Sequence, residues 1–195
     1  LTYFILPEPE TRQQTKTAPQ SLLAGLTGVP SWSVGIILLT YLMYMTVFSG
    51  FETTFSIFTH KLLDFSVRDN SWLFVYIGLL SLVIQGTIAR RNFKNLKLIA
   101  VFSFILFSVG LFMLAQVQTL PALMVSVAVM SFGIATLGSF LPALMSIYSD
   151  PASQGKAMGI YESIGSLSRI IGPLIAYSVI IGDPRGGYLV YAAIT

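Results

Sequence analysis

Long apolar runs, separated by short stretches that carry most of the charges, dominate the 195 residues of this chain. A helix needs about 20 residues to cross the roughly 30 Å hydrocarbon core of a bilayer, and five runs reach that length. We therefore predict five full transmembrane spans, at about 34–57, 72–89, 98–117, 120–147 and 157–181. Run length carries this prediction, because a spanning helix is apolar on all sides and shows little helical period.

Both ends of the chain have the pattern of incomplete spans. Residues 1–6 resemble the last turns of a preceding transmembrane helix stopped by Pro7 and Pro9, and a sixth span starts from about 187. The chain begins without methionine, and residues 1–6 are too short for the apolar region of a signal peptide. We expect a piece of a longer polytopic protein, with 7–33 as a polar linker and 34–195 as the transmembrane part.

Composition agrees with a membrane protein and gives little support to an enzyme. Hydrophobic residues make up 54% of the chain and charged residues 10%, against about 25% charged in soluble domains. There is no cysteine and one histidine, and no metal-ligand spacing, nucleophile triad or glycine-rich phosphate loop stands out. We therefore expect no catalytic residues, no metal and no cofactor.

Positive charge sets the predicted orientation. The loop 89–97 carries Arg90, Arg91, Lys94 and Lys97 without an acid, which places it in the cytoplasm by the positive-inside rule. Alternation then puts the linker and loop 148–156 in the cytoplasm, with 58–71, 118–119 and 182–187 outside. Segment 59–72 is amphipathic, which predicts a short interfacial stretch ending at Trp72. The basic loop is too short, and too closely flanked by spans, to indicate nucleic-acid binding.

Polar side chains inside the predicted spans are the candidates for function. Arg169 lies near the middle of the fifth span and Glu162 about 10 Å away, two helical turns earlier. We expect both on one face, shared with Gly165, Ser166 and Gly172. A charge at the bilayer midplane costs at least about 2.5–3.5 kcal/mol, so Arg169 should face a cavity and have a partner.

The first span supplies a further candidate partner and an aromatic stripe. Glu52, towards the outer end of that span, is the second carboxylate that could meet Arg169. The alternative is that Arg169 serves a buried ion pair that locks helices together, or snorkels to the interface. The stripe could line a pocket for a flat organic substrate, or simply pack against other helices or lipid; its members are Tyr41, Tyr44, Phe48, Phe51 and Phe55. Pro142 and Pro173 predict helix bends that each free a carbonyl.

Three segments resemble the major facilitator superfamily. QGKAMGIYESIGSLSRIIGPLIAY (154–177) is similar to its eleventh helix, in the drug:proton antiporter branch typified by tetracycline exporters; the matching positions include Gln154, Gly155, Gly159, Gly172 and Pro173. Residues 85–97 resemble the second copy of its loop motif, where Gly86, Arg91 and Lys94 match, but Arg90 replaces the acid and Phe93 the later glycine. Residues 49–66 are similar to the seventh helix of eukaryotic tetracycline-transporter-like proteins.

The resemblance implies an all-α membrane protein, with this chain as the C-terminal six-helix half of a twelve-helix bundle. It implies a secondary transporter of a small organic solute or drug, working by alternating access, with the bilayer, the N-terminal half and the solute as partners. From their positions in the spans, and not from the resemblance, we expect Arg169 to hold an anionic group or a carboxylate and Glu162 or Glu52 to carry a coupled proton, with Tyr41 and Tyr44 lining the cavity. The alternative is a non-transporting, transporter-like subunit that acts as a scaffold with other membrane subunits.

Overall fold

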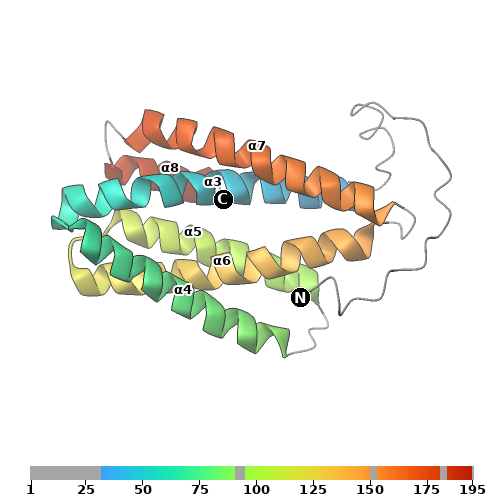
Figure 1. Cartoon of the computed structure of the whole chain (residues 1–195), viewed down its shortest axis with the longest axis horizontal. Coiled ribbons are helices and arrows are strands. Elements are labelled where there is room, and N and C mark those ends of the chain that lie inside the picture. Colours follow the sequence, from blue (N-terminus) through green and yellow to red (C-terminus); the bar gives the residue numbers. More distant parts are fainter. Residues whose placement is uncertain (1–31, 91–94, 150–152, 181–183, 195) are drawn as a thin grey trace, which may run out of the picture. The chain divides into compact units, whose positions relative to one another are not determined.

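The computed structural model describes residues 32–90, 95–149, 153–180 and 184–194, and every regular element among them is a helix. Successive helices run in alternating directions with their axes roughly aligned (Figure 1). The predicted helix end at 1–6 and the linker 7–33, apart from its last two residues, fall outside the described residues. The helices are α3 Trp32–Leu63, α4 Val67–Ala89, α5 Leu96–Ala115, α6 Leu120–Tyr148, α7 Gln154–Ile180 and α8 Pro184–Ile194.

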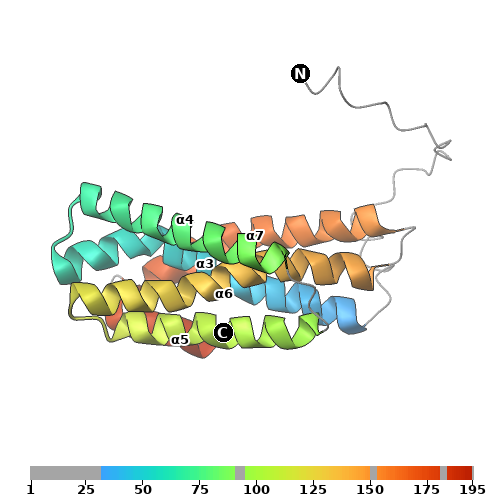
Figure 2. The ribbon, with the colours of Figure 1, turned by 90° about the horizontal axis from the view of Figure 1, so that it is seen from below.

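Two helix pairs organise the packing. The helices α3 and α7 lie against each other over much of their length, and α5 and α6 form the second close pair. α6 also contacts α3, which joins the two pairs, and α8 packs against α5 and α7. α4 packs mainly against α6, on the side away from α5 (Figure 2).

Four described helices, α3 to α6, are long and apolar enough to cross a membrane. The fifth predicted span corresponds to α7, whose 27 residues reach about 40 Å at about 1.5 Å per residue. It is not among the four, and Glu162, Ser166 and Arg169 lie within its otherwise largely apolar sequence. α8 has 11 described residues.

The connection between α3 and α4 is shorter than the sequence suggests. A loop was expected at 58–71, but α3 continues to Leu63 and α4 begins at Val67. Asp64 has a left-handed backbone with φ of 55°, which ends α3. The predicted interfacial stretch is therefore the end of one helix and the first turn of the next.

A capping box explains why α4 begins in such polar sequence. The Ser66 hydroxyl accepts a hydrogen bond from the Asp69 amide, and the Asp69 carboxylate accepts one from the Ser66 amide at 2.9 Å. Asn70 is buried behind this turn, where its Oδ1 accepts a hydrogen bond from the Thr59 hydroxyl of α3 at 2.5 Å. The junction is thus fixed by side-chain hydrogen bonds at both helix ends.

Glycines allow close approach within both helix pairs. A Cβ at Gly172 of α7 would overlap the Thr46 carbonyl of α3 and lie 3.0 Å from the Gly50 amide nitrogen. A Cβ at Gly110 of α5 would lie 2.6 Å from the Met130 Cβ of α6. Small residues at such contacts let backbones touch, which is how helices commonly associate in lipid.

Candidate functional site

The three charged residues predicted within the spans are all exposed on helix surfaces. Glu52 lies on α3, and Glu162 and Arg169 lie on α7. Within the described part of the chain, none of these side chains forms an ion pair or hydrogen bond, so the partner expected for Arg169 is not found there. Glu162 is two turns away along the same helix, about 10 Å, which is too far for a direct pair.

The side of α7 that carries the charges is distinct from the side that packs on α3. Glu162, Ser166 and Arg169 are exposed, whereas Gly165 and Gly172 are buried. The expectation that charges and glycines share one face is therefore wrong. Three residues fall about 60° short of a full turn at about 3.6 residues per turn, which is enough to rotate the glycines into the helix contact.

Tyr41 is part of the contact between α3 and α7. Its ring stacks on that of Tyr161, with centroids 3.7 Å apart and planes inclined by 13°. A Cβ at Gly165 would lie 2.5 Å from the Tyr41 hydroxyl oxygen, so the glycine makes room for the ring. Glu162 and Arg169 are both within electrostatic range of this hydroxyl. Tyr41 is thus buried in the contact between α3 and α7, close to Glu162 and Arg169.

Tyr44 also packs against neighbouring helices. Its hydroxyl donates to the Ile134 carbonyl of α6 at 3.3 Å, and its ring meets the Phe107 ring edge-on with centroids 5.5 Å apart. Phe51 and Phe55 are buried as well, and only Phe48 is partly exposed. The stripe faces several neighbouring helices: Phe51 meets the Tyr188 ring of α8 and Phe55 the Phe74 ring of α4, both edge-on.

Pro173 lies inside α7, and a hydroxyl of α3 compensates for the hydrogen bond that it removes. Proline has no amide hydrogen, so the Arg169 carbonyl, four residues earlier, lacks its usual helical donor. The Ser49 hydroxyl of α3 donates to this carbonyl at 3.4 Å. One turn along, the Tyr191 hydroxyl of α8 donates to the Gly172 carbonyl, also at 3.4 Å.

The other motif positions divide into three groups. The Gln154 side-chain amide donates to the Ser146 hydroxyl and ties the start of α7 to the end of α6. Gly86 and Gly155 are exposed, and a Cβ at either would meet nothing within 4 Å, so the described residues give no packing reason for them. Arg91 and Lys94 lie outside the described residues.

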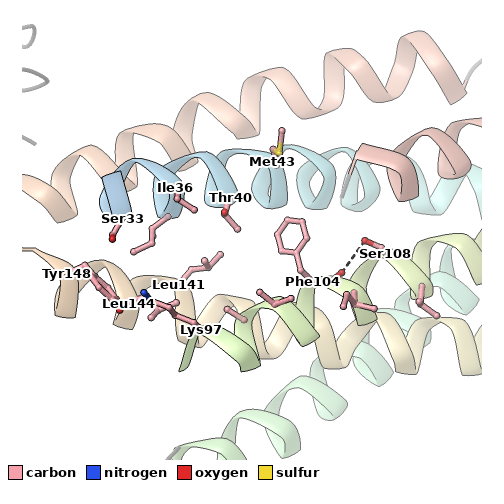
Figure 3. Close-up of a pocket in the computed structure, with 15 residues that line it drawn as sticks. Ser33, Ile36, Thr40, Met43, Lys97, Phe104, Ser108, Leu141, Leu144 and Tyr148 are labelled. Carbon is pink, nitrogen blue, oxygen red and sulfur yellow. Dashed lines mark hydrogen bonds between the residues drawn. The ribbon is translucent and has the colours of Figure 1, made fainter. Parts of the chain in front are cut away.

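A separate cavity of about 600 Å³ lies between α3, α5 and α6. Lys97 and Tyr148 lie at one end of it, with the Lys97 ammonium 4.7 Å from the Tyr148 ring centroid (Figure 3). Most of the remaining lining is apolar, as at Ile36, Met43 and Phe104. The cavity contains none of the predicted site residues, so it is not the place where the charged residues of α3 and α7 act.

Comparison with known proteins gives consistent matches. The family model described as Major Facilitator Superfamily matches residues 1–195. Major facilitator superfamily domain-containing protein 10 of Mus musculus is 37% identical over 142 residues, covering 72% of this chain and 31% of that protein. The Bos taurus protein of the same name is 33% identical over 171 residues, 86% of this chain and 37% of that protein. The chain thus spans about a third of the length of these curated relatives.

The same relationship is seen among solved structures. The crystal structure of the human organic anion transporter MFSD10 (TETRAN) superposes with a TM-score of 0.81 at 27% sequence identity. The match covers 88% of this chain and 44% of the human chain. The described helices therefore have the arrangement of slightly less than half of that fold.

Proposed function

Because this chain belongs to the Major Facilitator Superfamily, we propose that it is the C-terminal half of a secondary transporter that moves organic anions by alternating access. The chain is an all-helical, multi-pass integral membrane protein, and its superfamily consists of transporters, not enzymes. The substrate class in this proposal is supported by the human structure, which is described as an organic anion transporter. The N-terminal half and the bilayer are the proposed partners.

The main support for the proposal is that the Arg169 side chain has no partner within the described part of the chain. It lies in the middle of α7, is exposed, and has no ion-pair partner among the described residues. A guanidinium at the bilayer midplane is costly unless it meets water or an opposite charge. An anionic group of the solute supplies that charge, and the planar guanidinium can bind a carboxylate or sulfonate with two parallel hydrogen bonds.

The distribution of exposed residues on α7 supports a cavity beside Arg169. Leu167, Ile170 and Leu174 are 49%, 65% and 66% exposed, and they lie roughly 100° around the helix from the charged side. An apolar exposed side suits lipid, whereas a side with Glu162 and Arg169 does not. We therefore assign the charged side to an aqueous cavity between this half and the N-terminal half.

We also propose that transport is coupled to the movement of protons. Glu162 and Glu52 are exposed carboxylates without a partner in the described part of the chain, and either could take up a proton as the solute binds. Exchange of a drug against protons, as in the antiporter branch, is proposed from the resemblance of 154–177 to that branch.

Uptake into proteoliposomes tests the proposed function. The full-length protein that contains this half is reconstituted and offered benzenesulfonate or phenyltrimethylammonium, two aromatic ions of fixed and opposite charge that do not cross lipid readily. We expect protein-dependent uptake of benzenesulfonate and little uptake of the cation. Equal transport of both ions, or no uptake above protein-free liposomes, contradicts the proposal.

A further inference from the structure

We propose that Ser49 is the residue that positions Arg169 for its role in the cavity. Its hydroxyl supplies the hydrogen bond that Pro173 removes from the Arg169 carbonyl. A backbone carbonyl without a donor inside a membrane costs free energy, so a hydroxyl in this place stabilises the helix around Pro173. The role of Arg169 as the anion-binding cation is taken from the proposed function.

Close packing brings Ser49 to this carbonyl. The backbones of α3 and α7 touch at Gly172, where an added Cβ would lie 3.1 Å from the Ser49 Cβ. Ser49 is 7% exposed, so water cannot readily replace its hydroxyl. The hydrogen bond spans 120 positions of sequence and joins the backbone of Arg169 directly to α3.

Other hydroxyls on the two helices behave differently. Ser163 and Ser166 of α7 donate to carbonyls four residues earlier in their own helix, as serine usually does. Ser168 also donates to its own helix, at Ile164, and contacts the Leu42 carbonyl of α3 at 3.3 Å. Among the described residues of α3 and α7, Ser49 is the serine whose hydroxyl bonds solely to a partner helix, and its acceptor is the carbonyl freed by proline.

The hydrogen bond from Ser49 fixes the position of the Arg169 backbone relative to α3. A proline bend allows the two parts of a helix to change their relative direction. Because Ser49 bonds to the carbonyl that Pro173 leaves without its helical donor, the Arg169 backbone keeps a constant position relative to α3. From there the guanidinium is directed into the proposed cavity between the two halves. Without the hydroxyl, we expect the side chain to sample more directions and to bind an anion less well.

A double-mutant cycle tests this inference in the full-length transporter. Ser49→Ala should raise the KM for benzenesulfonate about two- to tenfold, the range expected for one net hydrogen bond, with kcat changed less. Pro173→Ala restores an amide donor to the Arg169 carbonyl, so Ser49→Ala should have no further effect in that background. Ser168→Ala is the matched control and should leave KM unchanged. An equal effect of Ser49→Ala in both backgrounds overturns the inference.

A second readout does not depend on transport. In full-length protein freed of other cysteines, Arg169→Cys is labelled with an anionic, membrane-impermeant methanethiosulfonate. Ser49→Ala should change the labelling rate by at least about twofold, a difference that one lost hydrogen bond can produce, and the change should vanish with Pro173→Ala. An unchanged labelling rate overturns the positioning role of Ser49. Absence of benzenesulfonate uptake with a Ser49-dependent labelling rate would instead contradict the proposed substrate class alone.

Discussion

Tyr41 of α3 and Tyr161 of α7 stack face to face, with ring centroids 3.7 Å apart. They lie towards the end where both helices begin, and the Gly50–Gly172 contact follows further along the same pair. The first contact is made by two large rings, and the second by one helix backbone packed against the other. Together they hold α3 and α7 as a unit, which presents Glu162 and Arg169 on its exposed surface.

The tyrosine stack should contribute strongly to stability. Tyr161 is 3% exposed, so Tyr161→Ala leaves a cavity between two helices and should cost about 3 kcal/mol or more. Tyr177→Ala, on the same helix but 42% exposed, is the control and should cost much less. Thermal unfolding of the purified full-length protein measures both. Similar losses of stability in the two variants would show that the tyrosine stack does not hold α3 and α7 together.

Glycine substitutions should separate packing positions from open ones. Gly172→Ala forces apart the backbones of α3 and α7, and overpacking of this kind typically costs about 1–3 kcal/mol. At Gly159 of the same helix a Cβ meets nothing within 4 Å, so Gly159→Ala should be neutral or mildly stabilising. A comparison of the two unfolding temperatures checks this. If Gly159→Ala lowered the unfolding temperature as much as Gly172→Ala, the prediction would be contradicted, because Gly159 would then have a close neighbour.

The junction of α3 and α4 should depend on one buried side chain. Asn70→Ala removes the acceptor of the Thr59 hydroxyl and should speed hydrogen exchange in the first turns of α4, which buries few other residues. Ser71→Ala is the control, because the Ser71 hydroxyl is exposed and bonds only to Val67 of its own helix. Equal exchange rates in the two variants would mean that the Thr59–Asn70 bond does not hold the junction.

Run length was sufficient to predict where the helices lie, but it did not locate their ends. The four spans from α3 to α6 were recognisable because lipid requires about 20 apolar residues in sequence. The start of α4 was missed by five residues, since Arg68, Asp69 and Asn70 look like loop residues. The Ser66–Asp69 capping box was the local signal that could have placed it.

The sequence identified the candidate residues of the site, but it did not predict which contacts they make. Glu162 and Arg169 stand out because charge is rare in an apolar run. The burial of Gly165 and Gly172 could have been inferred from an angular count around the helix. The hydrogen bond from Ser49 to the Arg169 carbonyl could not have been inferred, because nothing in the sequence around a serine in an apolar helix indicates a partner 120 residues away.

Proton coupling should reside in one of two carboxylates. If Glu162 or Glu52 takes up the coupled proton, its replacement by Gln should abolish the stimulation of benzenesulfonate transport by a pH gradient while exchange at equal pH continues. The other variant then serves as the control. Transport rates at several imposed gradients make the measurement, and stimulation retained in both variants would exclude these residues as the proton carriers.

Transport of benzenesulfonate by Arg169 variants of the full-length protein tests the central claim most directly. Arg169→Ala should reduce uptake to near the protein-free level, because it removes the cation proposed to bind the substrate's anionic group. Arg169→Lys should keep part of the activity, since it retains the charge but loses the two-pronged hydrogen-bonding geometry. Unaltered uptake by a stably folded Arg169→Ala protein would contradict the account.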